Sequence, residues 1–187
     1  MGTRGMYGFY KDGITKATYN HYDSDISGLG FKVANFIKSK SIKDLNRIFD
    51  RIIIVDANTH PTEEQIKQCE QYINTSIGEP SKQITWYQLL RETQGDLSAY
   101  EDDIPYMIDY SGFITDSLNC EWAYLINLDT NKLEIYEGFQ RKQNEPKHRY
   151  SIDTPQYETY YSCDLIKEIP LLEVSKEALE ELNNEEY

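Results

Sequence analysis

The dipeptide Asp12-Gly13 restricts the fold of this chain more than any other feature, because it separates two segments rich in aromatic and β-branched residues. Asp-Gly between such segments is a strong signal for the two-residue turn of a β-hairpin. We therefore predict a hairpin over residues 3–22. In the register that this turn fixes, Arg4 lies opposite His21 at the open end. Because side chains alternate along a strand, both point to the same side of the hairpin.

Further strands are predicted in the second half of the chain. Apolar side chains alternate before and after the turn sequence Asp129-Thr130-Asn131, which predicts a second hairpin over residues 121–138. A last strand is predicted from Tyr157 to Cys163 or Ile166. Two strands alone are only marginally stable, so we expect both hairpins to share one sheet.

Helices are predicted mainly between the two hairpins. Helical periodicity and capping residues place them at about 31–39, 42–55, 62–73 and 85–92, with a short C-terminal helix over 175–184. The apolar run 52–55 is equally compatible with a short strand. Strands at both ends with helices between them predict an α+β fold. We expect a single domain over residues 1–187, in which helices cover mainly one face of an antiparallel sheet.

Charge is distributed unevenly along the chain. The 187 residues include 19 Lys or Arg and 32 Asp or Glu, which gives a formal net charge of −13. Residues 92–131 contain no Lys or Arg at all. Two interpretations are open. The acidic half is either a solvated surface that aids solubility, or a negative surface that meets a basic partner and steers its association.

The most acidic part is predicted to be an irregular segment over residues 93–118, in which tyrosines alternate with carboxylates. A tyrosine offers rigid apolar area with a polar tip, and carboxylates accept hydrogen bonds from Arg and Lys, so the combination suits a protein-binding surface. The alternative is that these rings pack on the protein's own sheet. The candidate binding residues are Tyr100, Glu101, Asp102, Asp103, Tyr106, Asp109 and Tyr110.

A cationic stripe is predicted on the second helix. Lys43, Arg47 and Arg51 repeat every four residues and therefore line one side of it. Residues 32–51 are thus a candidate contact for the phosphates of guide RNA or DNA. The alternative is that the stripe is the solvated face of an amphipathic helix.

A candidate catalytic site lies at the open end of the first hairpin. Asp23 follows His21 by two residues and points to the same side if the strand continues, which joins it to Arg4 and His21. Arg binds phosphate or carboxylate well, and His21 held by Asp23 can act as a general acid or base. The loop Gly28-Leu29-Gly30 opens a helix whose free N–H groups suit an anion. The alternative is that Arg4 pairs with Asp23 and His21 makes a structural hydrogen bond.

Several classes of site are not expected. The three cysteines are far apart without a Cys-x-x-Cys pair, which argues against a disulfide framework and a zinc site. The three histidines are too scattered to indicate a metal, and we expect no cofactor. No apolar run approaches the ~18 residues of a membrane helix, and no secretory leader is evident. We therefore expect a cytosolic protein without a membrane partner.

Two resemblances bear on function. The segments Gly2-Thr3-Arg4-Gly5 and Tyr19-Asn20-His21-Tyr22-Asp23-Ser24 resemble an uncharacterised family of small bacterial and phage proteins, to which the segment 121–129 is also similar. That resemblance implies no activity. In bulk character, as a small, acidic, tyrosine-rich chain, the protein also resembles phage-encoded type II anti-CRISPR inhibitors. This second resemblance implies a basic Cas nuclease such as Cas9 as the partner, in the host cytosol.

Two functional hypotheses follow from the sequence. The favoured one is an inhibitor from a phage or mobile element that binds a nucleic-acid-targeting defence complex through its acidic, tyrosine-rich surface. The alternative is a small cytosolic hydrolase or RNA-cleaving enzyme that uses Arg4, His21 and Asp23. The first depends on the acidic residues forming one surface, and the second depends on those three side chains meeting.

Overall fold

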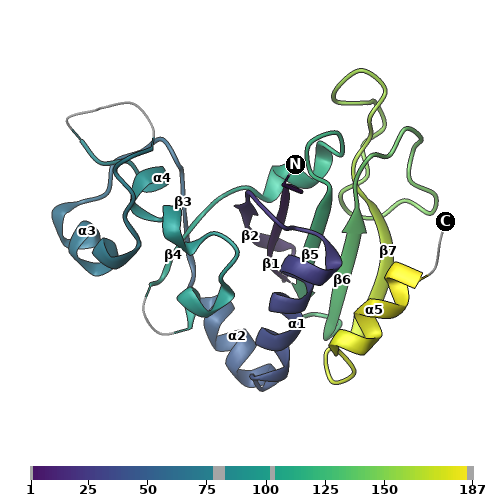
Figure 1. Ribbon diagram of the computed structural model, residues 1–187, viewed down its shortest axis with the longest axis horizontal. Coiled ribbons are helices and arrows are strands. Elements are labelled where there is room, and N and C mark those ends of the chain that lie inside the picture. Colours follow the sequence, from purple (N-terminus) through teal and green to yellow (C-terminus); the bar gives the residue numbers. More distant parts are fainter. Residues whose placement is uncertain (1, 78–82, 102–103, 185–187) are drawn as a thin grey trace.

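The computed structural model describes residues 2–77, 83–101 and 104–184 and confirms an α+β fold. A five-stranded sheet has the strand order β2-β1-β5-β6-β7, and a two-stranded sheet, β3-β4, lies beside its β2 edge (Figure 1). The strands of the larger sheet are β1 (Gly5–Lys11), β2 (Ile14–Asn20), β5 (Trp122–Asn127), β6 (Lys132–Glu137) and β7 (Asp164–Pro170).

Both predicted hairpins are confirmed. In β1 and β2, Met6 pairs with Tyr19 and Tyr10 with Thr15, and the left-handed φ angles of Asp12 (51°) and Gly13 (77°) suit the tight turn between them. The hairpins share one sheet, as expected. The predicted sheet is confirmed as mostly antiparallel, with one exception: β1 and β5 pair in parallel. The long helical connection between them allows this, since parallel neighbours need a crossover.

Helices cover one face of the larger sheet. Figure 1 shows α1 (Phe31–Lys38) and α5 (Lys176–Asn184) in front of the strands. Their buried residues, among them Val33, Ile37 and Leu179, pack in one apolar cluster with Tyr7 and Phe9 of β1. Helix α2 (Ile42–Arg51) begins at a capping box, in which Ser41 and Asp44 satisfy each other's backbone N–H groups. This layer forms the main core.

The two-stranded sheet corrects the predicted extent of the second helix. That helix ends at Arg51, and β3 (Ile53–Val55) pairs in parallel with β4 (Tyr106–Ile108) inside the segment that was predicted to be irregular. The β-branched run favours the strand, and only the distant β4 selects it over a helix. The third and fourth helices are shorter than predicted, as α3 (Glu63–Cys69) and α4 (Trp86–Leu89).

The opposite face of the larger sheet is covered mainly by irregular chain. The loop 139–163 and the 3₁₀ turn η5 (Ser111–Thr115) contribute to a second apolar cluster there, with Met6, Ala17 and Leu125 from the sheet. The predicted strand from Tyr157 is wrong, because β7 begins only at Asp164. Within the described ranges, no helix is long and apolar enough to span a bilayer.

Candidate functional site

The open end of the first hairpin contains a surface cavity of about 500 Å³, and both Arg4 and His21 line it. The confirmed register of β1 and β2 brings these two residues together, although they are distant in sequence. The volume falls within the range of small-molecule sites, which is roughly 300–1,000 Å³. The remaining lining residues are Gly2, Tyr22, Leu118, Glu121 and Phe139.

Arg4 is fixed through its backbone and through one end of its guanidinium group. Its backbone N–H donates to Glu121 Oε1 at 3.1 Å, and its carbonyl oxygen accepts from the Glu121 N–H at 2.9 Å. One guanidinium nitrogen donates to Asn119 Oδ1 at 2.9 Å. Asn119 is itself held by Asp116 at 2.8 Å. Arg4 forms no ion pair with any residue in the described ranges, so most of its five N–H donors remain available to an anion.

His21 is oriented by a single hydrogen bond. Its Nδ1 lies 2.7 Å from the hydroxyl of Tyr19, and Nε2 has no partner in the part of the chain that the structure describes. Burial lowers the pKa of His21, and the nearby guanidinium groups of Arg91 and Arg4 lower it further. The imidazole is therefore neutral at pH 7. When Nδ1–H donates to the tyrosine oxygen, Nε2 keeps a lone pair and can accept a proton.

The predicted contribution of Asp23 to this site is wrong. Strand β2 ends at Asn20, so the alternation that would carry Asp23 to the same side does not continue. Asp23 has a left-handed φ of 52°, and it is exposed outside the cavity lining. Its backbone carbonyl accepts from the Leu29 N–H at 2.8 Å. The carboxylate that lines the cavity belongs to Glu121, which the parallel pairing of β1 with β5 places beside Arg4.

The predicted anion site at Gly28-Leu29-Gly30 is already filled by the chain itself. These residues belong to a short π-helical turn, η1 (Ile26–Gly30), which runs directly into α1. The Asp25 carboxylate accepts from the Gly28 N–H at 2.8 Å and caps this turn. A carboxylate therefore occupies the position that an external anion would need.

Two exposed aromatic side chains line the cavity. Tyr22 is 61% exposed and Phe139 is 54% exposed, which is unusual for rings of this size. The Tyr22 ring meets the His21 ring edge to face, with 4.2 Å between their centroids. Exposed rings beside an arginine and a histidine offer both stacking area and positive charge.

The acidic, tyrosine-rich segment does not present the predicted surface. Tyr100 is only 1% exposed, so its assignment as a surface contact is wrong; its ring belongs to the main core. Tyr106 packs on Trp86 with 4.8 Å between ring centroids, and Tyr110 packs on Tyr19 at 5.5 Å. The alternative interpretation, in which these rings pack on the protein, therefore holds for the described tyrosines.

Two carboxylates of the same segment are bonded locally. Glu101 forms an ion pair with Lys40 at 2.9 Å, and Asp109 accepts from the Ser111 N–H at 2.8 Å. Glu121 and Asp129 lie before and after β5, so a whole strand separates them. Asp102 and Asp103 lie outside the described residues.

The cationic stripe on α2 is also divided. Lys43 and Arg47 are exposed, and Arg47 pairs with Asp44 of the same helix at 3.6 Å. Arg51 instead donates to the backbone carbonyl of Tyr100 at 2.8 Å, which fastens α2 to the chain beside it. The stripe therefore combines two solvated residues with one structural residue.

A buried polar network that sequence reasoning missed lies at the turn end of the first hairpin. Glu134 is only 2% exposed, and its carboxylate accepts from Asn127 Nδ2 at 2.7 Å, from the Tyr136 hydroxyl at 2.9 Å and from the Arg149 guanidinium group. The Arg149 guanidinium lies 3.9 Å from the centre of the Tyr10 ring. Arg149 comes from the loop 139–163, so this network fastens the loop to the sheet.

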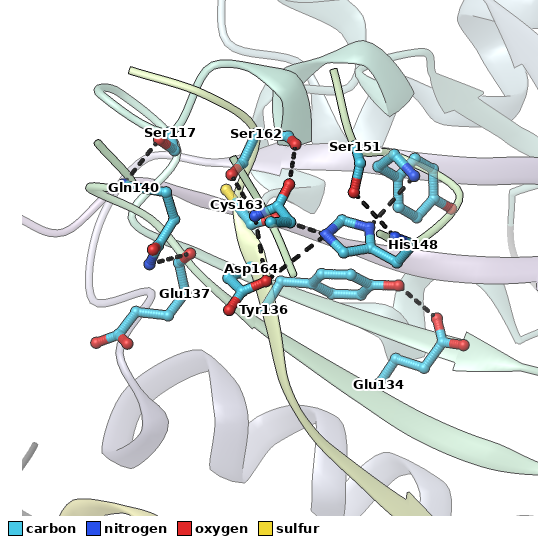
Figure 2. A network of polar contacts seen from close by, with 12 residues as sticks. Ser117, Glu134, Tyr136, Glu137, Gln140, His148, Ser151, Ser162, Cys163 and Asp164 are labelled. Carbon is cyan, nitrogen blue, oxygen red and sulfur yellow. Dashed lines mark hydrogen bonds and ion pairs between the residues drawn. The ribbon is translucent and has the colours of Figure 1, made fainter. Parts of the chain in front are cut away.

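His148 belongs to this network, and both of its ring nitrogens have partners (Figure 2). Nε2 donates to the Cys163 carbonyl at 3.0 Å, and Nδ1 accepts from the Tyr150 N–H at 3.3 Å. Asp164 lies 4.0 Å from Nε2. Burial lowers the pKa of His148 despite this carboxylate. Because its bonding capacity is used inside the protein, we assign His148 a structural role.

Comparison of the chain with family models, with curated proteins and with solved structures found no match in any of the three. The candidate site therefore stands on its geometry alone. Among the described residues, no group of three or more His, Cys, Asp or Glu side chains is placed to hold a metal ion.

Proposed function

We propose that this protein binds a phosphate-bearing ligand of the nucleotide class in the cavity at the open end of its first hairpin. The observation that carries the proposal is the convergence of Arg4 and His21 on one cavity, with unused hydrogen-bond donors on Arg4. A guanidinium group recognises phosphate oxygens through paired N–H donors. The exposed rings of Tyr22 and Phe139 supply faces on which a base can stack.

Glu121 limits which chemical groups, besides one phosphate, the ligand can carry. One of its carboxylate oxygens accepts from the Arg4 backbone N–H. The carboxylate can still accept from a ligand hydroxyl or amino group, because a carboxylate has roughly four acceptor positions. It also repels a second phosphate at its own end of the cavity. A nucleoside monophosphate therefore suits the site better than a triphosphate.

A second candidate function is cleavage of RNA, and the oriented imidazole of His21 favours it. In this reaction His21 Nε2 takes the proton from a ribose 2′-hydroxyl, whose oxygen then attacks the adjacent phosphorus. The bond from phosphorus to the 5′-oxygen breaks, a 2′,3′-cyclic phosphate forms, and the departing 5′-oxygen takes up a proton from water. The hydroxide that remains takes the proton from His21 and restores the neutral imidazole. Arg4 stabilises the negative charge on the phosphate oxygens while the new bond to phosphorus forms and the old one breaks. The hydrogen bond from His21 Nδ1–H to the Tyr19 hydroxyl sets the orientation of the ring.

The inhibitor hypothesis is the weaker proposal. A phage-encoded inhibitor of a Cas nuclease would dock through an acidic, tyrosine-rich surface. The ring of Tyr100 is buried and Glu101 pairs with Lys40, so these two predicted contact residues are engaged within the protein.

The proposal is tested by titrating the protein with uridine 5′-monophosphate, inorganic phosphate and uridine in an isothermal calorimeter. We expect uridine 5′-monophosphate to bind more tightly than inorganic phosphate or uridine. The variant R4A should lower its affinity about tenfold or more, since bonds to charged groups contribute about 1.5–3 kcal/mol. The matched control R47A removes an exposed arginine outside the cavity and should have no effect. Equal affinities for R4A and R47A would contradict the proposal.

Cleavage is tested separately with an RNA oligonucleotide and the same sequence bearing one 2′-deoxy residue. We expect cleavage of the RNA at every step except the deoxy position, and loss of cleavage in H21A with an unchanged unfolding midpoint. Cleavage that persists in H21A, or at the deoxy position, would contradict this mechanism while leaving the binding proposal intact.

A further inference from the structure

Beyond the cavity, a row of aromatic rings continues along the β2 edge of the larger sheet. From the Tyr22 ring, the next centroids are those of His21 at 4.2 Å, Tyr19 at a further 5.7 Å and Tyr110 at a further 5.5 Å. Phe113 flanks the row, 5.3 Å from Tyr19. The row thus leads out of the cavity toward the two-stranded sheet.

Fold contacts hold this row in place. The Tyr110 N–H donates to the Ala17 carbonyl of β2 at 2.9 Å, which fixes the chain after β4 against the larger sheet. Tyr19 and His21 are separated by one residue and share a side of the hairpin. The rings of Tyr19, His21 and Tyr110 are half-buried, whereas Tyr22 is exposed. Rings that are already held by packing lose little freedom when a ligand stacks on them.

Positive charge accompanies the row. Arg4 lies at its cavity end, and Arg91 lies near its middle. Burial raises the pKa of Tyr19 and the charges of Arg4 and Arg91 oppose that rise, whereas burial and the same two charges lower the pKa of His21. Arg91 is held by a hydrogen bond to Gln94 Oε1 at 2.7 Å, and its guanidinium lies 5.7 Å from the centre of the Tyr87 ring. Two arginines beside a row of rings match the usual design of single-strand binding sites, in which bases stack and cations track the backbone.

Negative charge limits the row at its other end. Asp56 follows β3 and Asp109 follows β4 at paired positions of the parallel sheet, and both line a cavity with Tyr110. Carboxylates repel a phosphate backbone, so the track should end near Tyr110. This makes the expected site short, about four nucleotides, at the lower end of the range for single-strand binders.

We propose that the ring row from Tyr22 to Tyr110, with Arg4 and Arg91 beside it, binds a short single-stranded nucleic acid. This inference rests on the proposed function and deepens it, because it replaces a single nucleotide with a strand whose next bases stack beyond the cavity. The strand enters at the cavity and ends at the carboxylates of Asp56 and Asp109. It is bound through its backbone charge and base faces and not through its sequence.

The experiment compares uridine monophosphate with oligouridylates of two, four and eight nucleotides by competition in fluorescence anisotropy, and includes oligothymidylates to separate RNA from DNA. Affinity should rise at least about fivefold with each further base up to four nucleotides, since each stacked base contributes about 1–3 kcal/mol, and then level off. Affinity for the tetramer should fall with salt, because bound phosphates release counterions.

Variants separate the strand from the cavity. R91Q should weaken tetramer binding about fivefold or more and leave monophosphate binding unchanged, whereas R47A should change neither. Y22A changes an exposed ring that belongs to both sites and should weaken both ligands. If R91Q alters the unfolding midpoint, the length dependence of binding to the wild-type protein decides the inference. A tetramer that binds no tighter than the monophosphate would overturn this inference while the cavity proposal stands. Failure of the wild-type protein to bind uridine monophosphate would instead overturn the proposal of a nucleotide site in the cavity.

Discussion

At both ends of the first hairpin, polar and aromatic side chains lie on the same face of the sheet. The two ends differ in how many of the hydrogen-bonding groups there have partners within the protein. At the turn end, Arg149 lies over the Tyr10 ring, and the Tyr150 hydroxyl bonds to Thr15 Oγ1 at 2.7 Å. At the open end, Arg4 and His21 line a cavity. Each end therefore has an arginine and a histidine beside tyrosine rings: Arg149 with His148 at the turn end, and Arg4 with His21 at the open end.

Coverage by the loop 139–163 explains the difference. At the turn end, this loop supplies Arg149 to the buried carboxylate of Glu134, and both nitrogens of His148 are engaged. At the open end the loop only begins, with the exposed ring of Phe139 at the cavity rim. Residue types alone therefore do not identify a site. Hydrogen-bonding capacity left unused beside a cavity does.

The largest expected effect is on stability, from loss of Arg149. The variant R149M leaves the buried Glu134 carboxylate without its cation and should lower the free energy of unfolding by about 2–3 kcal/mol. This is below the full cost of breaking a buried pair, because the Arg149 side chain is 27% exposed. The matched variant R4M should cost about 1 kcal/mol or less, since it loses one hydrogen bond to a neutral amide. Urea unfolding measures both, and a larger loss for R4M would break the comparison.

The next effect is on ligand binding, from loss of an exposed ring at the open end. Y22A should lower affinity for uridine monophosphate by about fivefold or more, because stacking on one ring contributes about 1–3 kcal/mol. Its free energy of unfolding should change by no more than about 0.5 kcal/mol, as expected for an exposed position. Calorimetric titration and urea unfolding on the same preparation test both statements. A stability loss without an affinity loss would place Tyr22 with the structural residues.

A smaller effect is expected from pH. The folded-state pKa of His148 lies below its unfolded value of about 6.5, so the unfolded chain binds more protons in that window. The stabilisation is therefore present above pH 6.5 and is lost as pH falls through the lowered value. H148N should flatten this dependence more than H21N, since His148 is the more buried ring. Urea unfolding between pH 7.5 and 5 provides the measurement, and an identical slope in both variants would count against the structural assignment of His148.

The smallest effect is expected on α2. Arg47 is exposed and pairs only with Asp44 of its own helix in the described structure. R47A should change the free energy of unfolding by less than about 0.5 kcal/mol and leave ligand affinity unchanged. A marked loss of oligonucleotide affinity would instead support the predicted contact of residues 32–51 with nucleic acid.

The sequence predicted the features that depend on local interactions and missed those that depend on contacts between distant parts of the chain. The approach of Arg4 to His21 at one cavity follows from the local Asp12-Gly13 turn, whose register was predicted correctly as far as Gly5 and Asn20. The cavity is lined by the carboxylate of Glu121 instead of the predicted Asp23. This depends on the parallel pairing of β1 with β5, which no local pattern encodes. The same reason explains β3, whose strand state requires the distant β4.

Burial was the other quantity that local patterns could not supply. Tyr100 occurs in an acidic, hydrophilic segment, yet it lies in the main core, with its hydroxyl 3.4 Å from Thr93 Oγ1. Similarly, Arg149 and His148 occur in a polar segment that reads as a simple loop, although they fasten that loop to the sheet. In both places a few long-range contacts decide the role of a residue whose neighbours in sequence are solvated.

The most direct test observes the two contrasting histidines in one experiment. The imidazole signals of His21 and His148 are followed by NMR while uridine monophosphate is added, with His60 as the remaining histidine and H21N and H148N for assignment. We predict that the His21 signals shift in a saturable manner and that its pKa rises as the phosphate binds, while His148 stays unchanged. Shifts confined to His148, or no shift at either ring at millimolar ligand, would contradict a binding site at the open end of the hairpin.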